Sequence, residues 1–494
     1  MSPRTAAARE GNGVYEVAIV GAGPAGLAAA SVLREHGVRV AVIDEQLRAG
    51  GQILRQPPAG FSVEHWLPGR SYDRVKRVLR AVGDRPDIDW RLGATVLGLT
   101  GAASFRTQGA SAVPHRLWIQ DASGSRVLEA TAVLVATGCY ERPLAFPGWT
   151  LPGVMGAGAI QAFVKSQQFV PGERFVLTGS HPLQLVVADQ LLRAGARVAA
   201  VTFTQPPTRA AAVLRYPLAM LQQARQMVDV VRILARLRRA GVAVRFGTTI
   251  VRADGGDSIA SATLAPMHGG AVDGSRWEVV ECDRIGVCHG FIASSELARQ
   301  AGAGIRWGEH EGGWLIEHDA WLESSVANLF VAGEVTSVMG ADAALEKGRI
   351  AAIGILRTLG RIGEREAQRL AAAPRRRLRR LLRFASMLQE LSRPPEGLER
   401  QVVTGESLVC RCESITRAYF DEQLRENTHV ASADAAKLLT RAGMGMCQGR
   451  LCGDNVARLV ALARGLSPGE VGPLHARMPV KPVPLGTLCR DRCG

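Results

Sequence analysis

The stretch Glu16-Val-Ala-Ile-Val20 is followed directly by Gly21-Ala-Gly23-Pro24-Ala25-Gly26 and then by a run rich in Ala and Leu. Strand-like residues that enter three spaced glycines and then a helix are typical of a dinucleotide-binding βαβ unit. The first glycine allows the tight turn, the second lets the backbone approach a pyrophosphate, and the third lets the helix pack closely on the strand. The helix that starts at Pro24 directs its N-terminal amides toward the phosphates. We therefore expect a nucleotide-binding domain built around this stretch.

A second strand is expected from Arg39 to Ile43, and it ends on Asp44 and Glu45. An acidic side chain at this position accepts hydrogen bonds from the hydroxyl groups of an adenosine ribose. It favours an unphosphorylated ribose, as in FAD or NAD, over NADP. Because the strands, helix and acid all stand at the expected offsets, a glycine-rich turn in some other α/β protein is the less favoured alternative.

Composition limits the class of protein. A chain of 494 residues with 47% hydrophobic residues has room for two or three domains. Met1 to Gly13 is polar and lacks the apolar core of a signal peptide, and the apolar window from Val14 to Leu33 is broken by Gly and Pro. These features predict a cytoplasmic protein. The net charge of +15 comes mostly from arginines spread along the chain without interleaved aromatics, so nucleic acid is not expected as a partner.

A second βαβ unit is expected at Arg174-Phe-Val-Leu-Thr178-Gly179-Ser-His181-Pro-Leu-Gln184. His181 and Gln184 stand where the second and third glycines of the fingerprint belong. A Cβ at both points should keep a pyrophosphate away from the backbone. We expect this unit to have kept its fold and lost its dinucleotide, and a variant that still binds NAD(P)H is the alternative.

Four of the nine cysteines form a group, with Cys410-Arg-Cys412 and Cys447-Gln-Gly-Arg-Leu-Cys452 separated by helical sequence. Four thiolates can hold zinc or an iron–sulfur cluster. Zinc ribbons usually carry C-x2-C pairs, and glycines beside the second pair allow backbone amides to approach the sulfurs. A [2Fe–2S] cluster is therefore favoured over zinc. Of the remaining cysteines, Cys288 is expected to be buried and structural, and Cys489 and Cys493 to be thiols of a tail.

Together these motifs resemble the two-dinucleotide-domain flavoproteins that end in a bacterioferritin-associated-ferredoxin-like module. The C-x4-C spacing is similar to that in the FAD subunits of hydrogen cyanide synthase, opine oxidase and D-hydroxyproline dehydrogenase. Glu141-Arg142-Pro143 through Val154 and the closing Pro479 to Leu485 extend the resemblance. It implies that FAD, not NAD, occupies the first site, and that Glu334 replaces the usual Asp beside the ribityl chain. The FAD-binding residues that it implies are Gly21, Gly23, Pro24, Ala25, Gly26, Asp44, Glu45, Gly51, Gln52, Val96, Thr137, Gly138, Gly333 and Glu334, and the cluster ligands are Cys410, Cys412, Cys447 and Cys452.

The expected fold is α/β, with two Rossmann-like domains, the second inserted in the first, and a small helical C-terminal iron–sulfur domain. Arg284 to Phe291 is expected to be the strand that returns to the FAD domain. The arginine-rich helix from Glu364 to Leu391 is expected to be a solvated or partner-docking linker, with contact to an anionic membrane surface as a minor alternative. The expected boundaries are 1–155 and 282–362 for the FAD domain, 156–281 for the inserted domain, 363–400 for the linker, 401–466 for the iron–sulfur domain and 467–494 for the tail.

The resemblance implies the FAD/[2Fe–2S] electron-transfer subunit of a hetero-oligomeric dehydrogenase that oxidises an amino acid, imino acid or opine and passes electrons to a quinone or another acceptor. It also implies a D-amino-acid-oxidase-like flavoprotein as partner and allows a small ferredoxin-like subunit. Because a flavin takes up two electrons and a [2Fe–2S] cluster carries one, both in one chain form an electron conduit. Two alternatives stay open: a self-contained NAD(P)H-dependent reductase of an iron–sulfur partner, and a non-catalytic redox-sensing or scaffold subunit. No catalytic base is identifiable.

Overall fold

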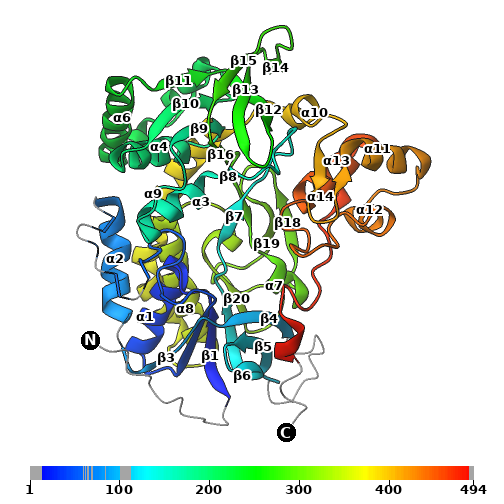
Figure 1. Cartoon of the computed structure of the whole chain (residues 1–494). Helices are drawn as coiled ribbons and strands as arrows, with labels where there is room; N and C mark the ends of the chain where they lie inside the picture. The colour runs from blue at the N-terminus through cyan, green and yellow to red at the C-terminus, as the bar shows by residue number, and fades with distance from the viewer. Residues whose placement is uncertain are drawn as a thin grey trace.

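The computed structural model describes residues 14–58, 60, 61, 63, 66, 67, 70–83, 85–100 and 113–488. The polar stretch from Met1 to Gly13 and the tail cysteines Cys489 and Cys493 lie outside the described residues. Two sheets with parallel cores lie one above the other, each with helices packed on it, and a small helical part lies at their side (Figure 1). The α/β fold with a small C-terminal domain is thus confirmed.

The first sheet has seven strands in the order β3-β2-β1-β6-β5-β4, with β20 also beside β6. The strands β3, β2, β1, β6 and β20 run parallel, whereas β5 and β4 run antiparallel. The strand β6 is long, because its first part pairs with β5 and its second part with β1. The bounds are β1 (Tyr15–Val20), β2 (Val40–Asp44), β3 (Ile88–Leu92), β4 (Thr95–Thr100), β5 (His115–Asp121), β6 (Gly124–Val135) and β20 (Leu329–Val331).

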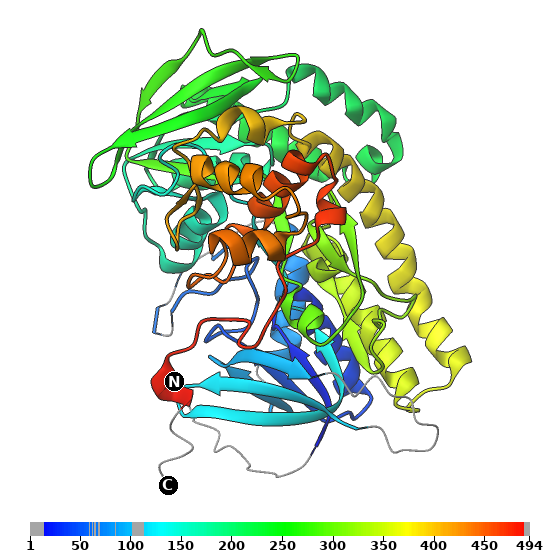
Figure 2. The same ribbon diagram turned by 90° about the vertical axis from the view of Figure 1, so that its right-hand side faces the viewer.

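Helices cover the first sheet. The helix α1 packs very closely on α8, since a Cβ on Gly348 would lie 2.1 Å from the backbone oxygen of Ala25. The helix α9 lies along α8 and forms one side of the molecule (Figure 2). It ends at Ser392, ahead of Pro394, as the sequence predicts. The bounds are α1 (Pro24–Glu35), α2 (Arg70–Val82), α8 (Ala341–Thr358) and α9 (Glu364–Ser392).

The second sheet has five parallel strands in the order β11-β10-β9-β16-β8. The expectation that residues 284–291 return to the FAD domain is wrong for most of this segment, because β16 pairs with β9 and β8. An apolar run reads the same in either parallel sheet, so the sequence could not assign it. Only β17 (Phe291–Ala293) leads back, paired with β7 (Cys139–Glu141). The bounds are β8 (Val154–Gly156), β9 (Arg174–Gly179), β10 (Arg197–Phe203), β11 (Ala243–Phe246) and β16 (Arg284–Cys288).

In the second domain, one helical segment is broken at a proline. The segment from Pro207 to Arg239 forms three consecutive helices, with one break before Pro217 and another at Gln223. An antiparallel sheet packs on the same domain. The helices are α3 (Ala157–Ala162), continued by the π-helical η1 (Phe163–Gln167), α4 (Leu183–Arg193), the 3₁₀ helix η2 (Pro207–Arg215), α5 (Pro217–Gln222) and α6 (Ala224–Arg239), and the strands are β12 (Thr248–Gly255), β13 (Ile259–His268), β14 (Ala271–Val272) and β15 (Glu278–Glu281).

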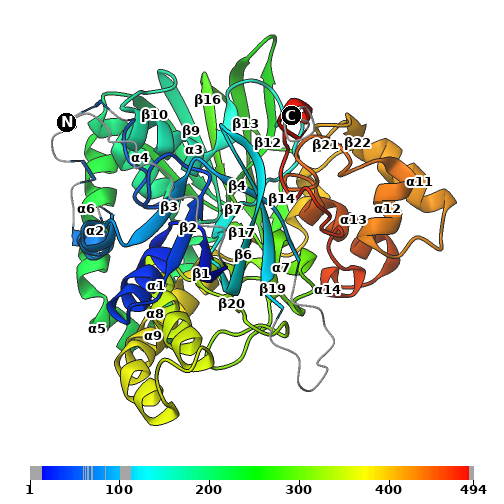
Figure 3. The ribbon, with the colours of Figure 1, turned by 90° about the horizontal axis from the view of Figure 1, so that it is seen from below.

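The C-terminal part lies beside both sheets (Figure 3). It packs against the hairpin β18–β19, where the rings of Trp307 and Trp314 lie 4.4 Å apart. The segment after α14 is not a loose tail, because Val480 is buried and its amide donates to the backbone oxygen of Leu97 at 2.8 Å. The bounds are α7 (Glu296–Gln300), β18 (Ile305–Gly308), β19 (Gly313–Ile316), the 3₁₀ turn η3 (Gly333–Val335), α10 (Leu398–Val402), β21 (Leu408–Cys410), β22 (Ile415–Thr416), α11 (Arg417–Glu426), α12 (Ala433–Thr440), α13 (Gly453–Arg464), α14 (Pro468–Val471) and α15 (Leu485–Leu488).

Among the helices of the described residues, none combines the length and the apolar composition that crossing a bilayer requires.

Candidate cofactor sites

The loop between β1 and α1 tolerates only glycine at two of its three fingerprint positions. A Cβ on Gly21, whose φ is +107°, would lie 2.4 Å from the backbone oxygen of Ala136, and a Cβ on Gly26 would lie 1.9 Å from the oxygen of Gly21. At Gly23 the nearest atom would be 3.8 Å away, so the packing of the fold does not require glycine there. The N-cap of α1 is Gly23, and no side chain caps the helix. The first turn therefore presents its amides in the way that binding a phosphate requires.

The two acidic residues at the end of β2 have different partners. The carboxylate of Asp44 accepts the amide of Ala22 at 2.6 Å and the amide of Gln46 at 2.8 Å. Burial raises the pKa of Asp44. Glu45 is more exposed and pairs with Lys481 from the C-terminal segment. Asp44 thus holds the glycine loop in place, and Glu45 is the acid that is not tied to that loop.

The ends of β6 and β20 lie side by side, because the two strands pair in parallel. They carry Thr137–Gly138 and Gly333–Glu334, respectively. The thiol of Cys139 donates to Oε2 of Glu334 at 2.8 Å. Burial and the nearby carboxylate raise the pKa of this thiol. The residue that replaces the usual Asp is therefore positioned by the strand end next to it.

A buried lysine of the second domain reaches the loop that follows β2. Nζ of Lys165, in η1, donates to the backbone oxygen of Gln52 at 2.6 Å and to Oε1 of Gln161 at 2.9 Å. Burial lowers the pKa of Lys165 to about 8. A Cβ on Gly51 would lie 2.8 Å from Cα of Gly23, so this loop touches the glycine loop directly. The expected FAD-contacting loop is thus held between the two domains.

Val96 lies further along the first sheet. It is buried in β4, two residues after Ala94, whose amide donates to the backbone oxygen of Asp44 at 3.0 Å. The other expected FAD contacts gather where the parallel strands of the first sheet end, which is where this class of fold binds ligands. The residues present there fit FAD, because the loop leaves no Cβ in the way of a pyrophosphate and its helix carries no capping side chain.

The corresponding loop of the second domain is filled by its own side chains. Nδ1 of His181 accepts the amide of Leu183 at 3.1 Å, and Nε2 of Gln184 donates to the backbone oxygen of Thr202 at 3.1 Å. Burial lowers the pKa of His181 to about 4, so the ring is neutral and its nitrogen can accept this hydrogen bond. A phosphate at this helix start would compete with the imidazole for the amide.

The end of α9 covers the same edge of the second sheet. Nε2 of Gln205 donates to the backbone oxygen of Ser180 at 2.6 Å and to that of Leu391 at 2.9 Å. The amide of Ser180 in turn donates to the backbone oxygen of Cys288 at 2.9 Å. These hydrogen bonds therefore connect the end of β9 to α9 and to the end of β16.

A buried carboxylate lies between the two sheets. Oε1 of Glu141, on β7, accepts the amide of Gly158 in the first turn of α3 at 2.8 Å. Cys288, expected to be structural, is fully buried and hydrogen-bonded to the same carboxyl group. Burial raises the pKa of Glu141 to about 7. His289 is also buried, and neither of its ring nitrogens has a partner among the described residues.

The four grouped cysteines come together in the C-terminal part, where Cys410 and Cys452 are buried and Cys412 is exposed. The thiol of Cys452 contacts the sulfurs of Cys410 and Cys447, and Cys447 also contacts Cys412. These hydrogen bonds lower the pKa of Cys410 to about 6 and that of Cys447 to about 5. A Cβ on Gly445 would lie 2.2 Å from Cβ of Cys412, so the loops that carry the two pairs pack tightly. Among the described residues, no group of three or more His, Cys, Asp or Glu is arranged to hold a single metal ion.

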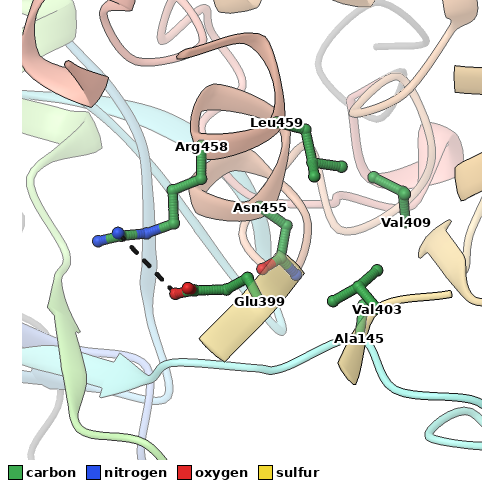
Figure 4. A pocket seen from close by; sticks show the side chains of 7 residues that line it. All are labelled: Ala145, Glu399, Val403, Val409, Asn455, Arg458 and Leu459. Atoms are coloured by element: carbon green, nitrogen blue, oxygen red, sulfur yellow. Dashed lines mark ion pairs between the residues drawn. The ribbon is translucent and has the colours of Figure 1, made fainter. Parts of the chain in front are cut away.

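A buried ion pair joins the C-terminal part to the remainder of the chain. Nε of Arg142 lies 2.7 Å from Oδ2 of Asp454, which also accepts from Arg458 at 2.9 Å. A small pocket beside Arg458 has a volume of about 10 Å³, room for roughly one water molecule. This junction is thus a packed interface rather than a substrate site. Figure 4 shows the residues that line the pocket: Ala145, Glu399, Val403, Val409, Asn455, Arg458 and Leu459.

Comparison with known proteins identifies the family of the chain. Residues 15–348 match the family described as pyridine nucleotide-disulphide oxidoreductase, and residues 407–492 match the sarcosine oxidase A3 domain. The chain belongs to the pyridine nucleotide-disulphide oxidoreductase family. Members of this family bind FAD, and the chain is a FAD-dependent oxidoreductase.

Full-length relatives agree with the expected resemblance. The chain is 32% identical to hydrogen cyanide synthase subunit HcnB of Pseudomonas protegens over 95% of its own length and 96% of the relative's. It is 33% identical to an opine oxidase subunit of Rhizobium meliloti over 96% of its own length and 87% of the relative's. Among solved structures, L-proline dehydrogenase from P. horikoshii matches with a TM-score of 0.68 at 20% identity, over 97% of this chain and 80% of that one. That likeness shows the shared fold.

Sequence reasoning missed the buried ionisable residues around these sites. The hydrogen-bond partners of Glu141 and Lys165 are distant in the sequence, so local patterns could not predict them. A signal existed for Lys165, since lysine occurs only at positions 76, 165, 347, 437 and 481 in a chain rich in arginine. Lys347 is a second buried example, and its Nζ donates to Oγ1 of Thr336 at 2.7 Å. An isolated lysine in such a chain indicates a site where arginine is too large or too strongly basic.

Proposed function

We propose that the chain is the FAD- and [2Fe–2S]-containing electron-transfer subunit of a hetero-oligomeric dehydrogenase. The complex oxidises a C–N bond of an amino acid, imino acid or opine, and its electrons pass to a quinone or another acceptor. The observation that carries this proposal is the combination, in one chain, of an open FAD-type glycine loop and four grouped thiols. The similarity over the whole chain to subunits of hydrogen cyanide synthase and opine oxidase supports the substrate class.

The proposed partners follow from the same relatives, whose names describe them as subunits. A D-amino-acid-oxidase-like flavoprotein subunit would carry out the oxidation of the substrate. A small ferredoxin-like subunit would be a further member of the complex. The chain itself would receive the electrons from that subunit, because His181 and Gln184 occupy glycine positions of the second loop and would keep a dinucleotide out.

The proposed FAD site is the edge where the parallel strands of the first sheet end. The first turn of α1 would bind the pyrophosphate with its amides, and Glu45 would accept from the ribose. Glu334, held by Cys139, would accept from the ribityl chain. Lys165 would fix the loop of Gly51 and Gln52 beside the flavin. A bound flavin accepts two electrons together and releases them singly.

The proposed cluster site is the group of Cys410, Cys412, Cys447 and Cys452. Tightly packed loops carry the two pairs, and the sulfur of Cys447 contacts those of Cys412 and Cys452, which supports a single cluster shared by both pairs. Backbone amides of Gly443 and Gly449 donate to the sulfurs of Cys410 and Cys447, respectively. Such hydrogen bonds tune the potential of a cluster. The boundary between this domain and the linker is proposed at residue 401.

The test uses the full chain purified without oxygen. We expect bound FAD. We also expect iron and labile sulfide, with as much sulfide as iron. The variant Cys447→Ser/Cys452→Ser should lose iron and sulfide and keep FAD, whereas the control Cys282→Ser, buried in the second domain, should keep both. Zinc in place of iron would overturn the cluster assignment.

The electron source is tested on the same material. We expect the flavin absorbance to remain unchanged with NADH or NADPH and to fall when an amino or imino acid is added together with the co-produced partner. Rapid bleaching by NADH alone would instead show a self-contained reductase. A cluster that stays oxidised throughout turnover would show a scaffold or sensing role.

A further inference from the structure

One face of the molecule combines exposed leucines with an excess of arginines over acidic residues. The segment from Pro207 to Arg239, which forms η2, α5 and α6, contains seven arginines and Asp229 as its single acidic residue. The side chains of Leu214, Leu218 and Leu221 are 80%, 57% and 77% exposed. These values are unusual for leucine, and the three lie close together along the chain. Exposed apolar residues gathered in this way mark an interaction surface.

The same face continues onto α9. Helices η2 and α5 pack against α9, and Glu390 near its end binds Tyr216 at 2.7 Å and Arg215 at 2.6 Å. Figure 2 shows α9 along the side of the molecule where these helices lie. Its middle carries exposed arginines that make no ion pair within the described part of the chain. They are Arg376, Arg377, Arg379, Arg380 and Arg383.

We propose that this face, formed by η2, α5, α6 and the middle of α9, binds reversibly to an anionic lipid surface. The arginines would lie at the phosphates of the headgroups, and the leucines would enter the boundary between headgroups and acyl chains. The helix α6 fits the same orientation, because Arg225, Val228 and Arg232 follow one another at helical spacing on its exposed side.

The combination of side chains favours a lipid surface over a protein partner. Arginine is also common in protein–protein interfaces, so the arginines alone do not decide between the two. Here exposed leucines and an excess of arginines occur on the same group of helices, and an anionic headgroup layer satisfies both kinds of side chain at different depths. Nucleic acid would match the arginines but would gain nothing from three exposed leucines. The inference goes beyond the proposed function and does not depend on it, since lipid binding requires neither cofactor nor partner.

The test is flotation of the full chain with vesicles of phosphatidylcholine alone or mixed with phosphatidylglycerol, at low and high salt. We expect binding only to the vesicles that contain phosphatidylglycerol. Replacing Arg376, Arg379, Arg380 and Arg383 with Gln should weaken binding by about six hundredfold, since each arginine near the surface contributes about fivefold. The variant Leu214→Ser/Leu218→Ser/Leu221→Ser should weaken it roughly tenfold or more.

Matched controls are Leu438→Ser and Arg425→Gln. Leu438 is 75% exposed and Arg425 is 73% exposed in its side chain, but both lie in the C-terminal part. They should bind vesicles as the wild type does, and bound FAD should be equal in all variants. Equal binding to neutral and anionic vesicles, or unchanged binding by both variants, would overturn the proposal. So would loss of a co-purified partner protein from the leucine variant without any lipid binding by the wild type, because the face would then belong to that partner.

Discussion

The two βαβ units of this chain have the same strand–loop–helix order, yet they treat the start of their helix in opposite ways. In the first unit the loop has glycine at all three positions, and no side chain caps α1. In the second, His181 accepts the amide of Leu183, and Gln184 is bound to Thr202. In the first unit no side chain caps the start of the helix, whereas in the second the imidazole of His181 accepts one of the first amides, that of Leu183.

This difference supports the expectation that the second unit has kept its fold and lost its dinucleotide. The second sheet retains its parallel strands and its packing, because the close approach at Gly179 is needed by the fold itself: a Cβ there would lie 2.0 Å from the backbone oxygen of Cys288. The positions that only a ligand requires have changed.

The largest expected effect distinguishes two kinds of glycine in the first loop. The packing of the fold requires glycine at Gly21 but not at Gly23. Gly23→Ala adds a Cβ with 3.8 Å to its nearest atom, so we expect a folded protein that has lost nearly all of its FAD. Gly21→Ala, at a φ of +107° and 2.4 Å from Ala136, should also destabilise the fold by about 3 kcal/mol. Flavin content and thermal unfolding of the two apoproteins measure both effects.

The control for this pair is Gly37→Ala, in the turn after α1, which has no atom within 4 Å of the added Cβ. It should keep FAD and lose only about 1 kcal/mol through its positive φ of +69°. If Gly23→Ala retained full FAD, the loop would not be a phosphate site, and the comparison between the two units would fail.

How far the sequence predicts this molecule depends on the distance between the interacting residues. The first βαβ unit was predictable because glycine spacing, apolar strands and the acid at the end of β2 all lie within thirty residues. The loss of glycine at His181 and Gln184 was also visible, although what the two side chains bind instead was not. The identity of β16 was predicted wrongly, since pairing between distant strands leaves no local pattern.

The contacts within the candidate cofactor sites were unpredictable from the sequence for the same reason. The contact between Lys165 and Gln52 joins residues 113 positions apart in two domains. The contact between Glu334 and Cys139 spans 195 positions. No period or motif encodes such pairs. They depend on how the two sheets are placed by β7 and β17, which only the folded chain determines.

A second way to test the comparison is to reopen the second loop. We expect no measurable NADH binding by the wild type, and binding at least tenfold stronger by His181→Gly/Gln184→Gly, because this variant frees the amide of Leu183 and removes two side chains from the loop. Fluorescence titration with NADH on the FAD-loaded protein provides the measurement.

Removal of a buried imidazole alone could loosen the domain, so His289→Gly provides the control: it deletes a buried ring at the end of β16 and leaves the loop unchanged. This variant should bind NADH no better than the wild type. Wild-type affinity equal to that of the reopened variant would mean that His181 does not block the site.

The prediction with the least bearing on cofactor binding, a change in stability alone, concerns Glu141, the carboxylate that the chain itself supplies to the first turn of α3. Burial raises its pKa from 4.5 to about 7, so between these values the folded chain holds a proton that the unfolded chain has released. Stability contributed by this group is therefore present at low pH and is lost as the pH rises toward 7, by about 2–3 kcal/mol. Glu141→Gln keeps the shape without the charge and should remove this part of the pH dependence. Thermal unfolding of both proteins from about pH 5 to pH 8 measures the difference. If the wild type instead gained stability relative to the variant as the pH rose, the amides of α3 would hold Glu141 as a resident anion, and this helix start would resemble an occupied phosphate site rather than a buried neutral acid.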